Sequence, residues 1–395
     1  MASIKLKKGR ARSINRKHPW IFSGAIESTK DIKQNGETVE IISYDGKNIG
    51  YGSYSAHSQI SVRVLSFNTE DIIDKKFFAK KIDNSIKFRK HIVDDNQTNA
   101  YRIINAESDL LPGLVVDKYS DFLVCQFLSA GAEFWKKDVV EILANHFKPI
   151  GIFERSDVVV REKEGLERIS GVLYGKSPTD LVEILENGNK FLVDIKNGHK
   201  TGFYIDQRTN RKFTSELSHG MEILNCFAYT GAFSVYAIKA GASKVINVDS
   251  SAEALMLADK NLKLNGIDPS KYENIEDDVF KYLRKLRDSN KQFDLIILDP
   301  PKFADSASQV EKASRGYKDI NLLALKLLKK NGVLVTFSCS GHIVAELFNK
   351  IVADAACDAD REVHILKYLT QSPDHTILTS FPEGLYLKGL VCKVN

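Results

Sequence analysis

The sequence has 395 residues, which is long for one hydrophobic core, so two or three domains are expected. The composition, with 43% hydrophobic and 27% charged residues, is that of a globular protein, and no stretch of about 18 apolar residues predicts a membrane span. The N-terminus lacks the apolar core of a secretory signal. Five scattered cysteines without a C-x-x-C pair predict reduced thiols in a cytoplasmic protein, and they argue against a disulfide scaffold or a zinc site.

The net charge of +5 is mild, but the positive charge is concentrated at the start of the chain. Residues 1–26 contain no acidic residue, and their basic residues alternate with apolar ones, which indicates a folded basic surface. Such surfaces usually meet polyanions, RNA or DNA first, while an ordinary solvated face is the alternative. The basic residues of this segment are Lys5, Lys7, Lys8, Arg10, Arg12, Arg16 and Lys17.

Residues 1–75 alternate short β patterns with turns, among them an Asp45-Gly46 hairpin signal, and predict a small all-β domain. The following stretch, 76–180, predicts a compact α+β unit that ends in a linker. Its predicted elements are a helix over about 74–92, a hairpin over 113–128, an amphipathic helix over 133–147, a strand at "GIFERSD" and a charged linker over 161–180.

From about residue 220 onward, buried strands alternate strictly with amphipathic helices, which predicts a parallel, doubly wound α/β sheet. Two final strands, about 362–369 and 385–394, follow one another without a helix, so the last strand should be antiparallel. The other predicted strands are "EILNCF" (222–227), "KVINVD" (244–249), "NIEDD" (274–278), "FDLIILD" (293–299) and "VLVTFSCS" (333–340), with helices near 232–240, 251–265, 279–288, 316–330 and 342–357.

The turn after the first of these strands, "NCFAYTGAFS" (225–234), contains a single glycine, Gly231, and two aromatic residues, Phe227 and Tyr229. A dinucleotide pyrophosphate needs close backbone approach and hence several glycines. Doubly wound sheets bind their ligands beyond the carboxyl ends of the strands. The turn therefore favours a ligand without phosphates.

Acidic residues follow the second and third strands. Asp249 can accept hydrogen bonds from both hydroxyls of a ribose, and Asp277 with Asp278 can reach an adenine amino group. Capping a helix is the more common role of an aspartate at such a position. Together with the glycine turn, however, these acids are suited to bind a nucleoside without a phosphate bridge. The combination predicts S-adenosylmethionine as the ligand.

The fourth strand ends in "LIILDPPKF" (295–303), where two prolines force a rigid exit from the sheet. Asp299 then projects beside the methyl donor, and Phe303 can stack on a planar base. The fifth strand ends in "TFSCSG", which places Cys339 next to Asp299 because neighbouring strand ends lie about 5 Å apart. A cysteine usually packs like a small hydrophobic residue, but this position favours a chemical role.

These motifs, together with four others, resemble the bacterial 23S rRNA (cytosine-C5) methyltransferases of the large-subunit methyltransferase I family. The resemblance extends over essentially the whole chain. The further motifs are "HPWIFSGAI" (18–26), "GHKTGFYIDQR" (198–208), "RGYKDIN" (315–321) and "PEGLYLKG" (382–389).

The resemblance implies an N-terminal PUA-type RNA-binding domain over 1–75, a central β-β-α-β-β domain with linker over 76–180, and a class I, Rossmann-like methyltransferase domain over 181–395. It also implies a 23S ribosomal RNA or large-subunit precursor as partner, no membrane or metal, and a homodimer as a candidate assembly. The candidate cofactor residues are Lys200, Phe203, Gln207, Arg208, Phe227, Tyr229, Thr230, Gly231, Asp249, Ser250, Asp278 and Asp299.

Methylation at C5 of cytosine requires a nucleophile that adds to C6, because C5 alone is too weak a nucleophile. We expect Cys339 to be this nucleophile, helped by a helix N-terminus near His342. Asp299 would recognise and protonate the base, with Pro300, Lys302 and Phe303 as further substrate contacts.

The position after the D-P motif, where many RNA cytosine-C5 methyltransferases carry a second cysteine, is Pro301. The base that releases the product is therefore unassigned, with Glu383, Asp374 and His375 as candidates. An RNA uracil-C5 methyltransferase would keep the same thiol, whereas a guanine-N7 or exocyclic-amine methyltransferase would not need it. An inactive RNA-binding module for ribosome assembly is the alternative from a different class.

Overall fold

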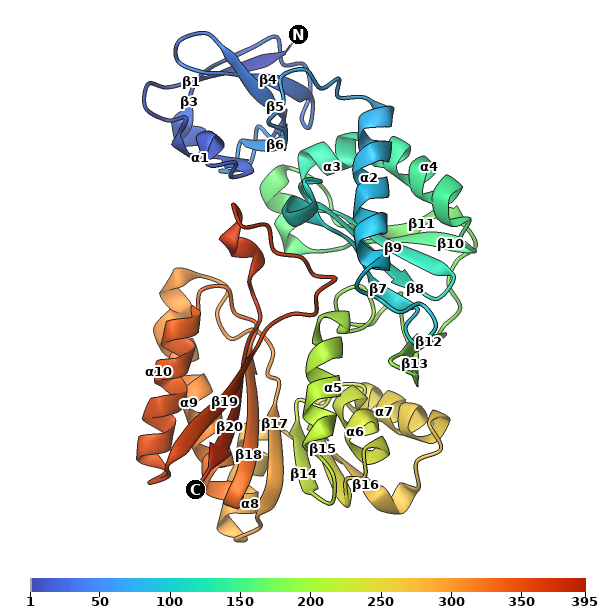
Figure 1. Ribbon diagram of the computed structural model, residues 1–395, viewed down its shortest axis with the longest axis vertical. Coiled ribbons are helices and arrows are strands. Elements are labelled where there is room, and N and C mark those ends of the chain that lie inside the picture. Colours follow the sequence, from blue (N-terminus) through green and yellow to red (C-terminus); the bar gives the residue numbers. More distant parts are fainter. Residues whose placement is uncertain (1) are drawn as a thin grey trace. The chain divides into compact units, whose positions relative to one another are not determined.

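The computed structural model describes residues 2–395 and divides the chain into two compact units (Figure 1). The first unit contains the chain up to Leu185, together with Val193–Ile205 and Pro373–Gly384. The second unit contains Glu186–Leu192, Asp206–Ser372 and Leu385–Asn395. The division into three domains at residues 75 and 180 stays a prediction.

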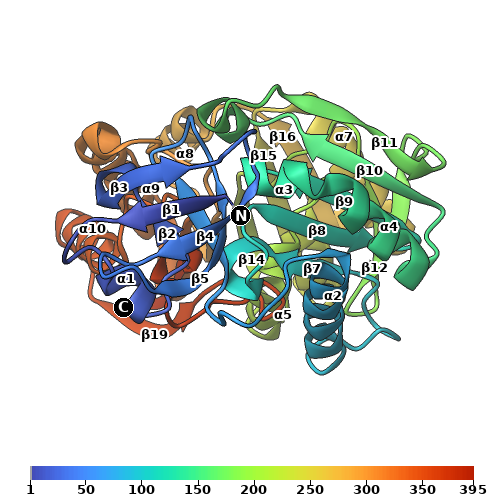
Figure 2. The ribbon, with the colours of Figure 1, turned by 90° about the horizontal axis from the view of Figure 1, so that it is seen from above.

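The first unit begins with a six-stranded sheet in the order β2-β6-β5-β4-β1-β3, several strands of which are visible in Figure 2. The Asp45-Gly46 turn joins the antiparallel strands β4 and β5, as predicted, and Gly46 has the positive φ of +85° that such a turn favours. The strands are β1 (Ser3–Leu6), β2 (Trp20–Ile21), β3 (Ile26–Lys30), β4 (Thr38–Ile42), β5 (Asn48–Tyr54) and β6 (Val62–Ser66), with a short helix α1 (Arg12–Asn15).

A five-stranded sheet in the order β11-β10-β9-β8-β7 follows, and the helices α2 and α4 share one apolar core with it. The prediction of a linker over 161–180 is wrong for Ile169–Gly175, because these residues form the edge strand β11. Strand β7 was not predicted. The elements are α2 (Lys75–Lys90), β7 (Ala100–Asn105), β8 (Leu114–Tyr119), β9 (Phe122–Phe127), α3 (Ala130–Phe134), α4 (Lys136–Phe147), β10 (Gly151–Ser156) and β11; a hairpin of β12 (Val182–Glu186) and β13 (Asn189–Val193) comes next.

The second unit is built on a seven-stranded sheet in the order β16-β15-β14-β17-β18-β20-β19. The strands from β16 to β18 are parallel, and β20 is antiparallel to both of its neighbours, which confirms the predicted doubly wound sheet with its antiparallel last strand. The strands are β14 (Glu222–Cys226), β15 (Lys244–Asp249), β16 (Tyr272–Glu276), β17 (Phe293–Leu298), β18 (Leu328–Ser338), β19 (Val363–Leu369) and β20 (Lys388–Val394).

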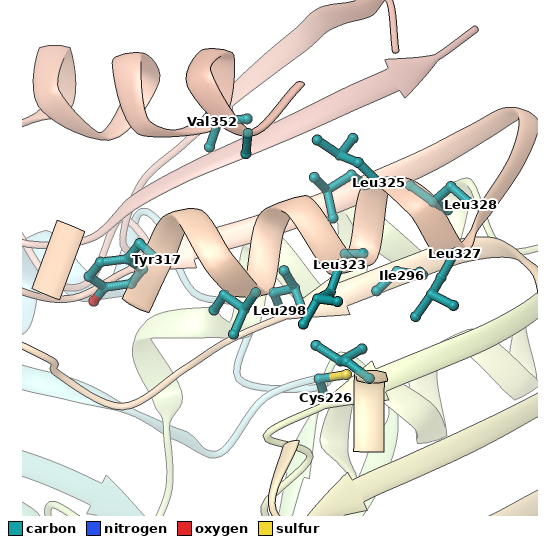
Figure 3. Close-up of a cluster of buried hydrophobic side chains, with 14 of the residues drawn as sticks. Cys226, Ile296, Leu298, Tyr317, Leu323, Leu325, Leu327, Leu328 and Val352 are labelled. Atoms are coloured by element: carbon teal, nitrogen blue, oxygen red, sulfur yellow. The ribbon is translucent and has the colours of Figure 1, made fainter. Parts of the chain in front are cut away.

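Helices cover both faces of this sheet (Figure 1). Helices α8, α9 and α10 pack on one face around the apolar cluster drawn in Figure 3, and α5 and α6 contribute to the cluster on the other. Two predicted boundaries are wrong, because α9 begins at Val310 and α10 begins only at Ala345, not near His342. The helices are α5 (Arg208–Glu216), α6 (Ala232–Lys239), α7 (Ala252–Leu264), α8 (Val279–Asp288), α9 (Val310–Leu327) and α10 (Ala345–Asp358).

A row of asparagines crosses three parallel strands of this sheet. Asn225, Asn247 and Asn274 are direct partners in the strand register, and their amides are hydrogen-bonded at 3.0 Å and 2.8 Å. The Ser234 hydroxyl on α6 also contacts Asn225 and Asn247. A shift of the register by one residue would break these buried hydrogen bonds, so the row fixes the alignment of β14, β15 and β16.

We expect Asn247→Ala to lower the free energy of unfolding by on the order of 2 kcal/mol, because it leaves the buried amide of Asn225 and the Ser234 hydroxyl short of an acceptor. Urea denaturation followed by circular dichroism measures the change. Glu276→Ala, on the exposed end of β16, is the control and should change stability by less than about 0.5 kcal/mol. Equal effects of the two substitutions would contradict the role given to the row.

Within residues 2–395 no helix is long and apolar enough to cross a membrane. The same residues contain no group of three or more histidine, cysteine, aspartate or glutamate side chains placed to hold a metal ion.

Candidate active site

The predicted functional residues of the second unit follow the carboxyl ends of its parallel strands. Cys226 is paired with Val248 and with Leu298, and Leu298 is paired with Thr336. The loops that follow β14, β15, β17 and β18 therefore leave the sheet at one edge, where doubly wound folds bind their ligands.

The loop after β14 has an uncommon backbone conformation. Phe227, Tyr229 and Gly231 have positive φ values of 59°, 47° and 73°. For the two aromatic residues this left-handed conformation is unfavourable, and such strain is concentrated at functional sites. Gly231 has a packing reason as well, because a Cβ atom there would lie 2.9 Å from the Cβ atom of Ala258. Thr230 is buried, and its hydroxyl has no hydrogen-bond partner among residues 2–395.

Asp249 ends β15, and its carboxylate is held by two backbone groups. The Tyr229 N–H donates to one oxygen at 2.8 Å, and the Ser251 N–H donates to the other at 3.0 Å. Each carboxylate oxygen keeps a further lone pair for another donor. The side chain is thus oriented in advance, while its neighbour Ser250 is exposed.

The acids after β16 have local roles in the structure. The Asp278 carboxylate accepts a hydrogen bond from the Lys281 N–H at 2.9 Å and caps the N-terminus of α8. Asp277 is 2.6 Å from the Lys285 ammonium, and this hydrogen bond lowers the pKa of Asp277. Contact of Asp278 with a cofactor stays a prediction.

Asp299 follows β17 and is oriented by a residue that the sequence placed among the cofactor contacts. The Gln207 amide donates to Asp299 Oδ1 at 3.0 Å, and its oxygen accepts from the Asn210 amide at 2.5 Å. Gln207 therefore connects α5 to the end of β17. Arg208, at the start of α5, is buried.

Cys339 follows β18 and lies beside the Asp-Pro-Pro segment, with its sulfur 3.9 Å from the Pro300 carbonyl oxygen. The next residue, Ser340, holds the two loops together. Its hydroxyl accepts hydrogen bonds from the backbone N–H groups of Phe303 at 3.1 Å and Ala304 at 3.3 Å, and it contacts the Tyr317 hydroxyl at 3.1 Å. The segments after β17 and β18 are therefore in contact, and the roles of Asp299 and Cys339 stay predictions.

The other cysteines differ from Cys339 in their surroundings. Cys125, Cys226 and Cys392 are buried, and burial raises the pKa of each thiol, to about 12 for Cys392. Cys357 is exposed on α10. Cys339 is partly exposed at the strand end, so it alone combines access with a place among the predicted functional residues.

The predicted substrate contacts differ in exposure. Lys302 is exposed and lies 3.1 Å from Asp305, whereas Pro300 is buried. The ring of Phe303 is partly buried, with its centroid 4.6 Å from that of Tyr317. Packing of Phe303 in the core was not predicted, and stacking on a base stays a prediction.

Five predicted residues belong to the first unit, where they have partners of their own. Lys200 lies over the ring of Tyr204, 4.4 Å from its centroid, and the buried Phe203 exchanges backbone hydrogen bonds with the Tyr119 hydroxyl. Asp374 accepts from the Arg102 N–H at 2.8 Å, and Glu383 lies 3.3 Å from His18. His375 is buried beside Asp374.

Sequence reasoning missed Lys388, the first residue of β20. Its side chain is buried, and its ammonium donates to the carbonyl oxygens of Ser340 at 2.7 Å and Tyr386 at 2.8 Å. Tyr386 in turn donates its hydroxyl to Asp206 at 2.6 Å. A lysine within the apolar run "LYLKGLVC" was the available signal.

The comparisons with known proteins agree with this architecture. A family model described as S-adenosylmethionine-dependent methyltransferase matches residues 157–380, and one described as PUA-like domain matches residues 4–67. The ribosomal RNA large subunit methyltransferase I of Aeromonas hydrophila is 51% identical and covers 100% of both chains, and that of Shewanella amazonensis is 49% identical and covers 99% of each.

Two solved structures have the same fold. A Streptococcus mutans protein assigned as a SAM-dependent methyltransferase is 23% identical and covers 100% of both chains with a TM-score of 0.85. A second methyltransferase structure, complexed with SAH, is 22% identical and covers 100% of both chains with a TM-score of 0.86.

The sheet and the family model define a methyltransferase that depends on S-adenosylmethionine, and this confirms the cofactor prediction. Within that class the chain belongs to the ribosomal RNA large subunit methyltransferase I family. The residues after β14 and β15 fit the cofactor, because Asp249 is oriented with free lone pairs and the buried Thr230 hydroxyl lacks a partner within residues 2–395.

We propose that Asp249 binds the ribose of S-adenosylmethionine. Asp249→Ala should raise the Kd for the cofactor about 10- to 100-fold, because a hydrogen bond to a charged group contributes about 1.5–3 kcal/mol. Isothermal titration calorimetry measures the affinity, and Asp288→Ala, at the exposed end of α8, is the control. Unchanged binding by Asp249→Ala would contradict the ribose assignment.

Proposed function

We propose that this protein transfers a methyl group from S-adenosylmethionine to C5 of a cytosine in large-subunit ribosomal RNA, with Cys339 as a covalent nucleophile. The class of RNA follows from the names of relatives about 50% identical over the whole chain. The observation that carries the chemistry is the partly exposed Cys339 thiol beside the loop that begins at Asp299.

The covalent step explains why a thiol is needed at this place. The Cys339 thiolate forms an S–C6 bond, and the electron pair of the C5–C6 double bond moves to C5. Bound S-adenosylmethionine would supply an electrophilic methyl group to C5, and the bond from that methyl group to the sulfonium sulfur would break, so that S-adenosylhomocysteine leaves. Loss of the C5 proton to a base then restores the double bond, breaks the S–C6 bond and frees the thiolate.

Asp299 is proposed to recognise the cytosine and to protonate it while the thiolate adds. A carboxyl group can bind the N3/N4 edge of cytosine, as donor at N3 and acceptor from the N4 amino group. The hydrogen bond from the Gln207 amide to Oδ1 holds the Asp299 carboxyl group in place at the end of β17. Pro300, Lys302 and Phe303 are proposed as further contacts of the substrate.

RNA binding by the N-terminal sheet is proposed to involve a basic and aromatic cluster. The ammonium groups of Lys5 and Lys8 lie 5.5 Å and 5.8 Å from the ring centroid of Tyr44, which is 50% exposed. Such a cluster offers positive charge to phosphates and a ring face to a base. The family model for a PUA-like domain covers these residues.

Cys339→Ala should abolish methylation and leave the Kd for S-adenosylmethionine within about threefold, because the sulfur is needed for the reaction and not for cofactor binding. The assay incubates the protein with labelled methyl donor and unmodified ribosomal RNA, and mass spectrometry identifies the methylated nucleoside. Cys357→Ala removes an exposed thiol and is the matched control, with unchanged turnover expected.

The nucleoside that forms separates the proposal from its alternatives. Formation of 5-methylcytidine supports the proposal. Formation of 5-methyluridine would mean that the target base is uracil, with the same thiol chemistry. Formation of 7-methylguanosine would overturn the covalent mechanism. Normal turnover by Cys339→Ala would also overturn it. If the native protein binds the cofactor but methylates nothing, the chain is an RNA-binding module.

A double variant, Lys5→Ala with Lys8→Ala, should weaken RNA binding. It should also reduce the slope of the logarithm of the RNA association constant against the logarithm of the salt concentration, because binding with fewer phosphate contacts releases fewer counterions. Fluorescence anisotropy at several salt concentrations measures the slope, which should fall by about 1 to 2. Lys260→Ala with Lys312→Ala removes the same charge from exposed helices of the second unit. Identical slopes for both double variants would mean that the N-terminal cluster is only solvated.

A further inference from the structure

A buried lysine lies next to the proposed nucleophile. Lys388 is the direct partner of Ser338 in the antiparallel pair of β18 and β20, and only 9% of its surface is exposed. Burying an ammonium group is unfavourable, and here the burial lowers the pKa of Lys388 to about 8. No carboxylate within residues 2–395 forms an ion pair with it to offset this cost.

Lys388 contacts the two residues that precede and follow Cys339 in the sequence. Lys388 faces Ser338 across the strand pair and donates to the carbonyl oxygen of Ser340, so it touches the residues on both sides of the cysteine. Its second acceptor is the Tyr386 carbonyl oxygen. An ammonium group has three N–H bonds, and the two carbonyls use two of them. Cys339 is also the group whose charge favours the protonated form of Lys388.

We propose that Lys388 is a positioning residue for Cys339: its ammonium group holds the Ser340 carbonyl in place and supplies the positive charge that stabilises the Cys339 thiolate. The inference rests on the proposed function, since it concerns the same thiol. An opposite charge within about 4–6 Å favours the ionised form of a group, and low dielectric strengthens the effect.

Other ionisable groups lie in the segments around this thiol. Lys302, in the loop after β17, is exposed and is paired with Asp305 at 3.1 Å. Asp299 after β17 is acidic, and Tyr317 on α9, whose pKa is raised by burial, bonds to the Ser340 hydroxyl. Tyr386 donates to Asp206, and His342 in the following loop is exposed. The N-terminus of α10 begins at Ala345, six residues after Cys339. Lys388 is therefore the buried cation in direct contact with the cysteine loop.

Alkylation by iodoacetamide tests the inference without relying on methylation. The background carries Cys357→Ser, so that Cys339 is the accessible thiol, and mass spectrometry of its peptide follows the rate at a series of pH values in the full chain. We expect Lys388→Met and Lys388→Gln to raise the pH midpoint of Cys339 alkylation by about one unit or more, and to slow alkylation at pH 7 about tenfold.

Three comparisons make the result specific. Lys393→Met removes an exposed charge from the same strand and should leave the midpoint unchanged. Lys388→Arg keeps the charge and should keep the midpoint within about 0.5 unit of the parent. Lys388→Gln should lower kcat while the Kd for S-adenosylmethionine, measured by calorimetry, stays within about twofold, which a general loss of structure would not do.

An unmoved midpoint in Lys388→Met or Lys388→Gln, when circular dichroism shows the variant to be folded, would overturn the inference. If both variants fail to fold, alkylation of the chain with Cys357 restored still tests the inference. The pH midpoint of alkylation must be lower at Cys339 than at Cys357, and an equal or higher midpoint at Cys339 would overturn the inference. The proposed function fails separately, because methylation by Cys339→Ala would remove the covalent mechanism and leave the alkylation result as it stands.

Discussion

The pairing of β17 with β18 is the constraint on which the proposed chemistry depends. Leu298 is aligned with Thr336, and from these positions the two strands lead to Asp299 and Cys339. Adjacent strands lie about 4.8 Å apart, so the pairing brings two side chains 40 residues apart in sequence to one edge of the sheet. Slippage of one strand by one residue would exchange the side chains that pack into the two apolar clusters, so the cores on both sides of the sheet stabilise the alignment of the site.

Polar side chains refine this alignment at the strand ends, where apolar packing is less directional. Ser340 uses one hydroxyl to fix the backbone after the Asp-Pro-Pro segment, and Gln207 connects α5 to Asp299. Asp249 is held by the backbone of the strained loop after β14. Buried hydrogen bonds of this kind add modest net stability but are costly to break, so they favour one arrangement of the loops over its alternatives.

The regular part of the fold could be predicted from sequence because its signals are local. The strands of the second unit are apolar runs and its helices have amphipathic patterns and caps, so their order was confirmed and only boundaries were displaced. Strand β11 lacked such a signal, because it is a mostly exposed edge strand without alternating faces. Helix α9 begins at Val310 and continues through Gly316, a residue type that is unfavourable within helices, so the local pattern did not reveal where the helix starts.

The same distinction between local and distant information separates Cys339 from Lys388. The cysteine could be chosen from sequence, because its place after an apolar run marks a strand end. The lysine could not, because its meaning comes from β20 lying against β18, with Lys388 opposite Ser338. A buried cation that is paired only with carbonyl oxygens lowers stability. A neutral residue of similar shape would pack there at lower cost, so the charge is best explained by the thiolate that the proposed reaction requires.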